Sequence, residues 1–286
     1  MINFFLISTS HLETNIWFKD DEDFKVGMNY VAISSFLSSV RIIAFILMSN
    51  HVHILVECSR DKAMEFINKF KKLYGYYFRI KYGAKELLRR NTADIQEVGR
   101  ELESLERVIA YILMNCVAAR ICLHPTGYKW GSCNCFFNQN KQKGVRLDSL
   151  SVRSRRRILR SRADLPEKWI LGEDGFILPE SYVCVDFVEA LYGSPARMNY
   201  FLNNSSKAKK VRESSGPSFR DQIINAAMID ICHTLFHVNS PEQLSMEDRR
   251  ELLSQLRRRF SADLNQVCRV TGIPYEEAAR MLDSCF

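Results

Sequence analysis

Two histidines stand two positions apart in a short apolar segment, His51-Val52-His53 within the stretch MSNHVHILV. Side chains at i and i+2 of a β-strand point to the same face of a sheet. Two neighbouring imidazoles on a rigid strand can hold one divalent metal ion, while Val52 points into the core. Ordinary, partly buried histidines have the same spacing, so the pair alone leaves both interpretations open.

A second group capable of chemistry lies on residues 100–122, which have the clearest amphipathic helix pattern of the chain. Its apolar side chains follow i, i+3, i+4 spacing and are Leu102, Leu105, Val108, Ile109, Ile112, Leu113, Cys116 and Val117. At about 100° per residue, Tyr111 falls roughly 150° from the centre of this stripe, beside Asn115 on the polar side. A core tyrosine would fall on the stripe, so Tyr111 is predicted to be a surface tyrosine or a reactive one.

The surrounding elements alternate between strand and helix patterns. Short apolar runs typical of strands are found at residues 3–8, 41–48 and 51–57. Helix patterns are found at residues 21–40, 61–82 and 100–122. The polar pair Ser49-Asn50 predicts a hairpin between the last two strands, and a further strand can precede residue 100. This order predicts an α+β sandwich with helices on one face of an antiparallel sheet.

Three segments resemble single-tyrosine transposases of the HUH type, and more specifically the group called REP-associated tyrosine transposases. They are Met48–Val56, the helix segment Tyr111–Ile121 (YILMNCVAARI) and the aromatic segment His124–Phe137 (HPTGYKWGSCNCFF). The resemblance covers roughly residues 1 to 138, about half of the chain. Ser49 before the histidines and Cys116 after the helix asparagine stand where family members commonly have proline.

The resemblance implies a ferredoxin-like antiparallel sheet and a metal-dependent enzyme that cleaves and joins DNA strands. His51 and His53, with Asn115 as a third ligand, would hold Mg²⁺ or Mn²⁺, which would polarise the scissile phosphate. Tyr111 would attack phosphorus and leave a 5′-phosphotyrosine with a free 3′-hydroxyl, so a second 3′-hydroxyl could reverse the step. The implied substrate is single-stranded DNA presented by a hairpin, and such enzymes act as homodimers or as monomers.

Two basic segments are candidates for contacts with the DNA backbone. The net charge is +7, which is only moderately basic, so the position of the charge matters more than its total. The predicted DNA-binding residues are Lys69, Lys71, Lys72, Arg79 and Lys81 on one helix and Arg155, Arg156 and Arg157 in a basic connector. Tyrosines on the same helix could pack in the core or stack on bases. A solvated basic face is the alternative for both segments.

The chain divides by pattern into three parts. They are a transposase-like domain at residues 1–140, the basic connector at 141–165 and a mainly helical region at 166–286. Residues 261–283 predict two helices around a glycine turn, with Pro274 at the start of the second. This pattern is typical of a helix-turn-helix, although Glu276 and Glu277 would face phosphates poorly. A purely structural helical hairpin is the alternative.

Composition narrows the class of protein. The chain is 47% apolar and 26% charged, which is typical of a globular protein. No apolar run approaches the roughly 18 to 20 residues of a membrane span, and the nine cysteines form no C-x-x-C pair. We therefore expect a cytoplasmic protein without a membrane partner, and the DNA substrate that the resemblance implies would make it nucleoid-associated. Three alternatives stay open: a related HUH replication initiator or relaxase, a non-catalytic DNA-binding protein on the same fold, and a regulator that uses only its C-terminal half.

Overall fold

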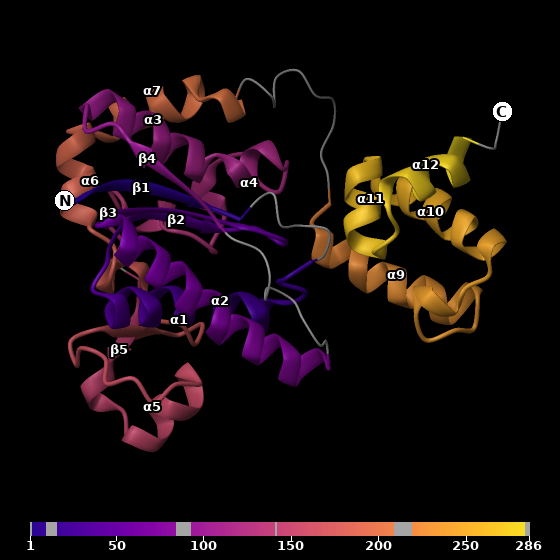
Figure 1. Cartoon of the computed structure of the whole chain (residues 1–286), viewed down its shortest axis with the longest axis horizontal. Helices are drawn as coiled ribbons and strands as arrows, with labels where there is room; N and C mark the ends of the chain where they lie inside the picture. The colour runs from indigo at the N-terminus through magenta and orange to yellow at the C-terminus, as the bar shows by residue number, and fades with distance from the viewer. Residues whose placement is uncertain (1, 10–15, 84–92, 141, 209–218, 284–286) are drawn as a thin grey trace.

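The first part of the chain is built around a four-stranded antiparallel sheet with the strand order β2-β3-β1-β4. The computed structural model describes residues 2–9, 16–83, 93–140, 142–208 and 219–283. The strands are β1 Asn3–Ser8, β2 Arg41–Leu47, β3 Val52–Cys58 and β4 Asp94–Val98. The hairpin of β2 and β3 therefore forms one edge of the sheet and β4 forms the other (Figure 1).

The α+β class, the hairpin and the further strand before residue 100 are confirmed. The turn predicted at Ser49-Asn50 lies between β2 and β3, and the pair Leu47 and Val52 closes the ladder before it. β2 is an edge strand, but other segments cover its outer side. Gly131 makes an isolated bridge with Ile46, and a side chain at this glycine would place its Cβ 2.8 Å from the Phe45 carbonyl oxygen. The close approach therefore requires glycine.

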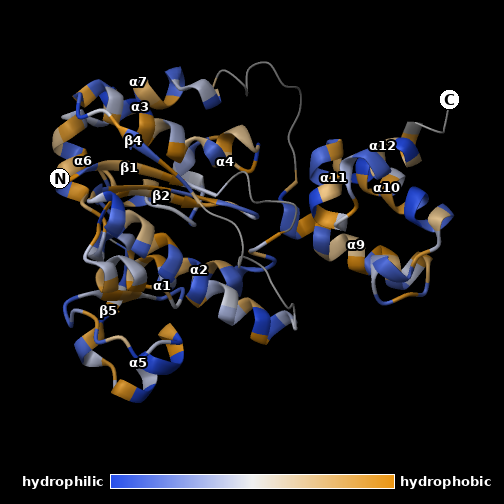
Figure 2. Ribbon diagram, in the orientation of Figure 1, coloured by the Kyte–Doolittle hydropathy of each residue, from blue (hydrophilic) through white to orange (hydrophobic). Residues whose placement is uncertain are grey.

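Helices cover both faces of the sheet, so the expected arrangement with helices on one face is wrong. The helices α1 (Asp21–Ser38) and α2 (Arg60–Tyr82) pack on one face. The helix α3 (Leu102–Leu113) packs on the other, with α7 (Pro195–Asn204) outside it (Figure 1). Nearly every residue of β2 and β3 is buried, and β2 is coloured mostly as apolar in Figure 2. A strand covered on both faces needs a continuous apolar run, as residues 42–47 have.

The helix predicted for residues 100–122 is shorter and interrupted. After α3 ends, a single further turn follows as α4 (Asn115–Ala118). The side-chain amide of Asn115 donates hydrogen bonds to the carbonyl oxygens of Tyr111 and Ile112, at 2.9 and 3.1 Å. An amide that bonds to the preceding turn competes with the regular backbone ladder, so a break at this position has a local cause.

The buried apolar side chains of the described residues form two separate hydrophobic cores. The larger core takes buried side chains from Phe5 to Ala208, and the smaller takes them from Ile224 to Met281 together with Ile16. The predicted domain limits after residues 140 and 165 therefore do not coincide with a division between the cores.

The basic connector is folded as part of the larger unit. Its first strand, β5 (Gly144–Arg146), pairs antiparallel with β6 (Ile170–Gly172). The short helix α5 (Val152–Leu159) lies between them in sequence and buries Leu159. In Figure 1 this helix lies beyond α1, on the side of the sheet opposite α3.

The smaller core belongs to a unit of four helices. They are α9 Asp221–Leu235, α10 Met246–Phe260, α11 Leu264–Thr271 and α12 Tyr275–Asp283. Gly272 caps α11 with a φ of +72°, which is the left-handed conformation that glycine adopts most easily. The helix, glycine turn and helix predicted for residues 261–283 are therefore confirmed as local structure.

The remaining helices are short. They are α6 Val185–Tyr192 and the 3₁₀ turns Pro125–Gly127, Cys133–Cys135, Leu147–Ser149, Pro179–Ser181 and Pro241–Gln243. None of the helices among the described residues is both long and apolar enough to cross a bilayer. Every cysteine in the described part of the chain is a free thiol, and most are buried, where a thiol packs as a small apolar side chain.

Candidate functional site

The two histidines lie together at the start of β3, on the same side of the strand as predicted. The centroids of the His51 and His53 rings are 4.9 Å apart, and the rings are nearly perpendicular, at 83°. The Nδ1 of His51 lies 2.9 Å from the side-chain oxygen of Asn50 in the hairpin turn. His53 is buried, with 2% of its surface exposed.

Tyr111 comes from α3 on the same face of the sheet and lies against the histidine pair. Its ring centroid is 5.5 Å from that of His53, with an interplanar angle of 77°. The side chain is half-buried and packs against the larger core, so it is not the surface tyrosine that the helix pattern allowed. The polar side of α3 is covered by the segment around Ser205, which the helix pattern alone could not show.

Asn115, the predicted third ligand, is buried one turn after Tyr111. Both of its hydrogen bonds to the preceding carbonyl groups use the amide nitrogen. The amide oxygen is the atom that an asparagine offers to a metal ion, and neither bond uses it. A ligand role for Asn115 is compatible with this orientation and stays a prediction.

Two cations that the sequence did not indicate reach the same site. Lys207 follows α7, and its Nζ lies 4.7 Å from the centroid of the Tyr111 ring. Burial is the largest cause that lowers the pKa of His53 to about 4, and the charge of Lys207 is the second. Burial also lowers the pKa of His51 well below its usual value. The charges of His53, Lys207 and Arg269 of α11 are the further causes, in that order. The C-terminal helical unit therefore contributes charge to the histidine pair.

These shifts define the protonation states of the site. Both imidazoles are neutral at pH 7, which is the form that binds a metal ion. Burial raises the pKa of Tyr111, so its phenol keeps its proton at that pH. The Nδ1 of His53 is buried and has no hydrogen-bond partner in the part of the chain that the structure describes. An unpartnered buried imidazole nitrogen beside a second neutral imidazole fits a divalent ion.

The donor set at this site contains no carboxylate. Among the described residues, no three histidine, cysteine or acidic side chains gather as metal ligands do. Two imidazoles and an amide oxygen would therefore be the protein ligands, with the remaining positions left to a substrate and solvent. Imidazole ligation favours Mn²⁺ over Mg²⁺ on ligand preference.

The C-terminal unit is held at the hairpin turn next to the histidines. The hydroxyl of Ser49 donates a 2.5 Å hydrogen bond to the carboxylate of Asp221, at the start of α9. The adjacent Gln222 donates a 2.7 Å bond to the Phe18 carbonyl oxygen. Asp221 also pairs with Arg269 at 3.3 Å. A proline in place of Ser49 would lack the hydroxyl that makes the first of these contacts.

The predicted DNA-binding residues of α2 lie on the face of the sheet opposite α3. Lys71 is only 9% exposed, and Lys81 binds the carboxylates of Asp20 and Asp23. Lys69 pairs with Glu65, whereas Lys72 and Arg79 are exposed. The structure therefore does not bring this set to the histidine pair.

The arginines of the connector are also distant from the site. Arg156 and Arg157 are exposed on α5, and Arg155 is half-buried. Because α5 lies beyond α1, the sheet and a helix separate these residues from Tyr111 (Figure 1). A role of either basic set in DNA binding stays a prediction, and it would need a DNA path that extends around the sheet.

The chain matches no protein-family model, no curated protein and no solved structure. The likeness to single-tyrosine transposases therefore depends on the three sequence segments alone.

Proposed function

We propose that the chain cleaves and joins single-stranded DNA through a covalent bond between Tyr111 and a 5′-phosphate. The observation that carries this proposal is the contact of the Tyr111 ring with His53, which in turn contacts His51. A tyrosine ring in contact with one of two adjacent neutral imidazoles is suited to metal-assisted phosphoryl transfer.

Each residue has a defined role in this proposal. His51, His53 and the amide oxygen of Asn115 would hold Mg²⁺ or Mn²⁺, which supplies Lewis-acid polarisation of the phosphate when bound. The Tyr111 oxygen attacks phosphorus, its proton passes to solvent, and the leaving 3′-oxygen takes up a proton. Lys207 lies over the Tyr111 ring, where its ammonium group stabilises the negative charge that develops during the attack. The new phosphotyrosine ester keeps the energy of the broken phosphodiester, so a 3′-hydroxyl can reverse the reaction.

The test is formation of a protein–DNA adduct that survives denaturation. Purified protein is incubated with Mn²⁺ and labelled single-stranded oligonucleotides that carry flanking hairpins, and the products are separated on a denaturing gel. We expect an adduct with the unmodified chain and with Tyr275→Phe, which changes an exposed tyrosine of α12. We expect none with Tyr111→Phe or with the double change His51→Ala and His53→Ala. An adduct that survives Tyr111→Phe would remove Tyr111 as the nucleophile.

A non-catalytic DNA-binding protein is the second candidate. It is favoured by the pKa of Tyr111, which burial raises, because a phenol that keeps its proton is a weak nucleophile. The positive charge of Lys207 would then hold a phosphate without chemistry. The same experiment separates the two candidates, because this one predicts DNA binding without metal ions and no adduct under any condition.

A further inference from the structure

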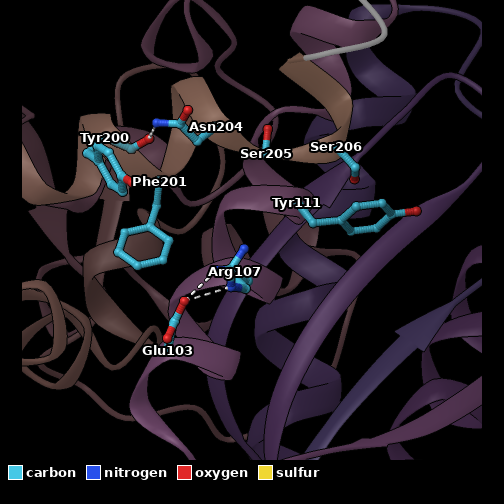
Figure 3. Close-up of a pocket in the computed structure, with 8 residues that line it drawn as sticks. All are labelled: Glu103, Arg107, Tyr111, Tyr200, Phe201, Asn204, Ser205 and Ser206. Carbon is cyan, nitrogen blue, oxygen red and sulfur yellow. Dashed lines mark hydrogen bonds and ion pairs between the residues drawn. The ribbon is translucent and has the colours of Figure 1, made fainter.

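A cavity of about 240 Å³ lies between α3 and α7, directly beside Tyr111 (Figure 3). It is lined by Glu103, Arg107, Tyr111, Tyr200, Phe201, Asn204, Ser205 and Ser206. The Tyr111 ring is thus shared, because it forms a wall of this cavity and also contacts His53. In Figure 3 its hydroxyl points away from Tyr200 and Phe201, so the cavity lies behind the reacting atom.

One side of the cavity is aromatic and open to solvent. Tyr200 is 64% exposed, although its neighbour Phe201 is buried in the larger core. The two rings meet edge to face, with centroids 5.6 Å apart and an interplanar angle of 86°. The buried side of α7 already anchors the helix, so packing does not explain an aromatic ring at the mouth of the cavity. Exposed aromatic rings of this kind are platforms on which the bases of single strands stack.

The other side of the cavity is polar and carries little net charge. Arg107 forms an ion pair with Glu103, which is one helical turn earlier, so its charge is already compensated. Asn204 uses its amide nitrogen in a 2.8 Å bond to the Tyr200 carbonyl oxygen, and Ser206 adds a hydroxyl group. Because Glu103 compensates the charge of Arg107, this side of the cavity is poorly suited to bind a phosphate group. Amide and hydroxyl groups beside an aromatic ring match the edge and face of a nucleobase.

We propose that this cavity binds the base of a nucleotide next to the phosphate that Tyr111 attacks. This inference depends on the proposed function and adds a site that recognises the DNA around the cleavage point. The volume is below the roughly 300–1,000 Å³ of pockets for drug-sized ligands, so one planar base fits better than a longer segment. A base held behind Tyr111 fixes the register of the strand, so the neighbouring phosphodiester reaches the hydroxyl, which points away from the cavity.

The test measures binding without cleavage. The protein carries Tyr111→Phe, which keeps the ring wall but removes the nucleophile, and metal ions are chelated. The probe is a fluorescent hairpin oligonucleotide with a short single-stranded tail, because the hairpin fixes the register. Abasic sites are introduced one at a time along the tail, and the dissociation constants are measured by fluorescence anisotropy.

We expect one tail position at which the abasic site weakens binding about 10-fold, the size typical of one lost stacking contact. In a protein that also carries Tyr200→Ala, the same abasic site should have little further effect, because the stacking partner is already absent. Tyr200→Phe should keep the sensitivity. The matched control Tyr275→Ala removes a tyrosine of α12 that is 54% exposed, against 64% for Tyr200, and should also leave the sensitivity intact.

The outcomes separate this inference from the proposed function. No sensitive position, or a sensitivity that persists in full with Tyr200→Ala, overturns the base pocket even if the adduct forms. A sensitive position coupled to Tyr200, together with no adduct in the cleavage assay, supports the pocket and overturns the nuclease. Because Tyr200 is exposed, Tyr200→Ala should melt at the same temperature as its parent, and this is measured alongside.

Discussion

Two buried polar clusters lie on opposite faces of the same sheet and differ in how completely their atoms are bonded. On the face of α1 and α2, the fully buried carboxylate of Asp23 accepts hydrogen bonds from the hydroxyls of Tyr77 and Tyr82, at 2.7 and 2.8 Å. It also accepts a 2.7 Å bond from Lys81 and a 2.8 Å bond from the backbone of Lys19. Protein atoms alone satisfy this cluster.

The histidine cluster on the face of α3 is incomplete by comparison. The buried Nδ1 of His53 has no hydrogen-bond partner among the described residues. The charges that act on the pair, from Lys207 and Arg269, are both positive. A cluster that satisfies itself stabilises the fold, whereas one with an unpartnered ring nitrogen and nearby cations is suited to an external ligand. The difference separates a structural cluster from a candidate site without any reference to known proteins.

The largest expected effect tests whether the Asp23 cluster stabilises the fold. Asp23→Ala leaves the Tyr77 hydroxyl without its partner and removes one of the two carboxylates that bind Lys81 and Tyr82. The loss of these buried bonds should lower the free energy of unfolding by about 3–5 kcal/mol. Urea unfolding followed by tryptophan fluorescence measures it, because Trp17, Trp130 and Trp169 all lie in the larger core. The matched control Asp21→Ala removes an exposed acid of the same helix and should change little. Equal losses in the two variants would contradict a structural role for the cluster.

The Asp23 cluster also shows what the sequence could predict. The acidic first turn of α1 and the length of α2 follow from local caps and apolar spacing, and the structure has both helices at the expected positions. Packing of α2 tyrosines in the core was one of two interpretations left open, and it is confirmed for the buried Tyr74 and Tyr77 but not for Tyr76, which is 59% exposed. Asp23 as the shared acceptor is not visible in the sequence, because its side-chain partners Tyr77, Lys81 and Tyr82 lie on α2, 54 to 59 residues further along the chain.

The residues of the candidate site could be predicted from the sequence only where strand or helix periodicity determines the direction of a side chain. The shared face of His51 and His53 follows from strand periodicity, and Tyr111 was singled out by its helix position and by the family resemblance. Lys207 and Arg269 carry no local signal, since only tertiary packing brings them to β3. The continuous apolar run of β2 did indicate a strand covered on both faces. The prediction of helices on one face did not take this run into account.

The next largest effect concerns the cations of the histidine cluster. Lys207→Met should lower the rate of adduct formation at saturating DNA about 10²- to 10³-fold, as loss of a group that stabilises developing charge does. The control is Lys129→Met, which removes a cation that lies over Trp130 at 4.4 Å, away from the histidines. Single-turnover gels measure both rates. Similar rates in the two variants would show that Lys207 acts only in packing.

A smaller effect distinguishes the clusters by their response to metal ions. At a free concentration of about 100 times its dissociation constant, Mn²⁺ should raise the free energy of unfolding by about 2.7 kcal/mol. The double change His51→Ala and His53→Ala should abolish the gain, whereas Asp23→Asn should keep it. Thermal melts with Mn²⁺ and with a chelator measure the difference. A gain that persists without the histidines would place the metal elsewhere.

The smallest expected effect is the sharpest test of the comparison. His53→Leu replaces a buried ring whose Nδ1 has no hydrogen-bond partner among the described residues, so loss of that atom leaves no described partner unsatisfied. In the presence of a chelator, the free energy of unfolding should therefore change by less than about 1 kcal/mol, against the several lost with Asp23→Ala. Tryptophan fluorescence in urea measures both variants under the same conditions. If His53→Leu is as destabilising as Asp23→Ala, the ring belongs to a structural network, and its missing partner no longer points to an external ligand.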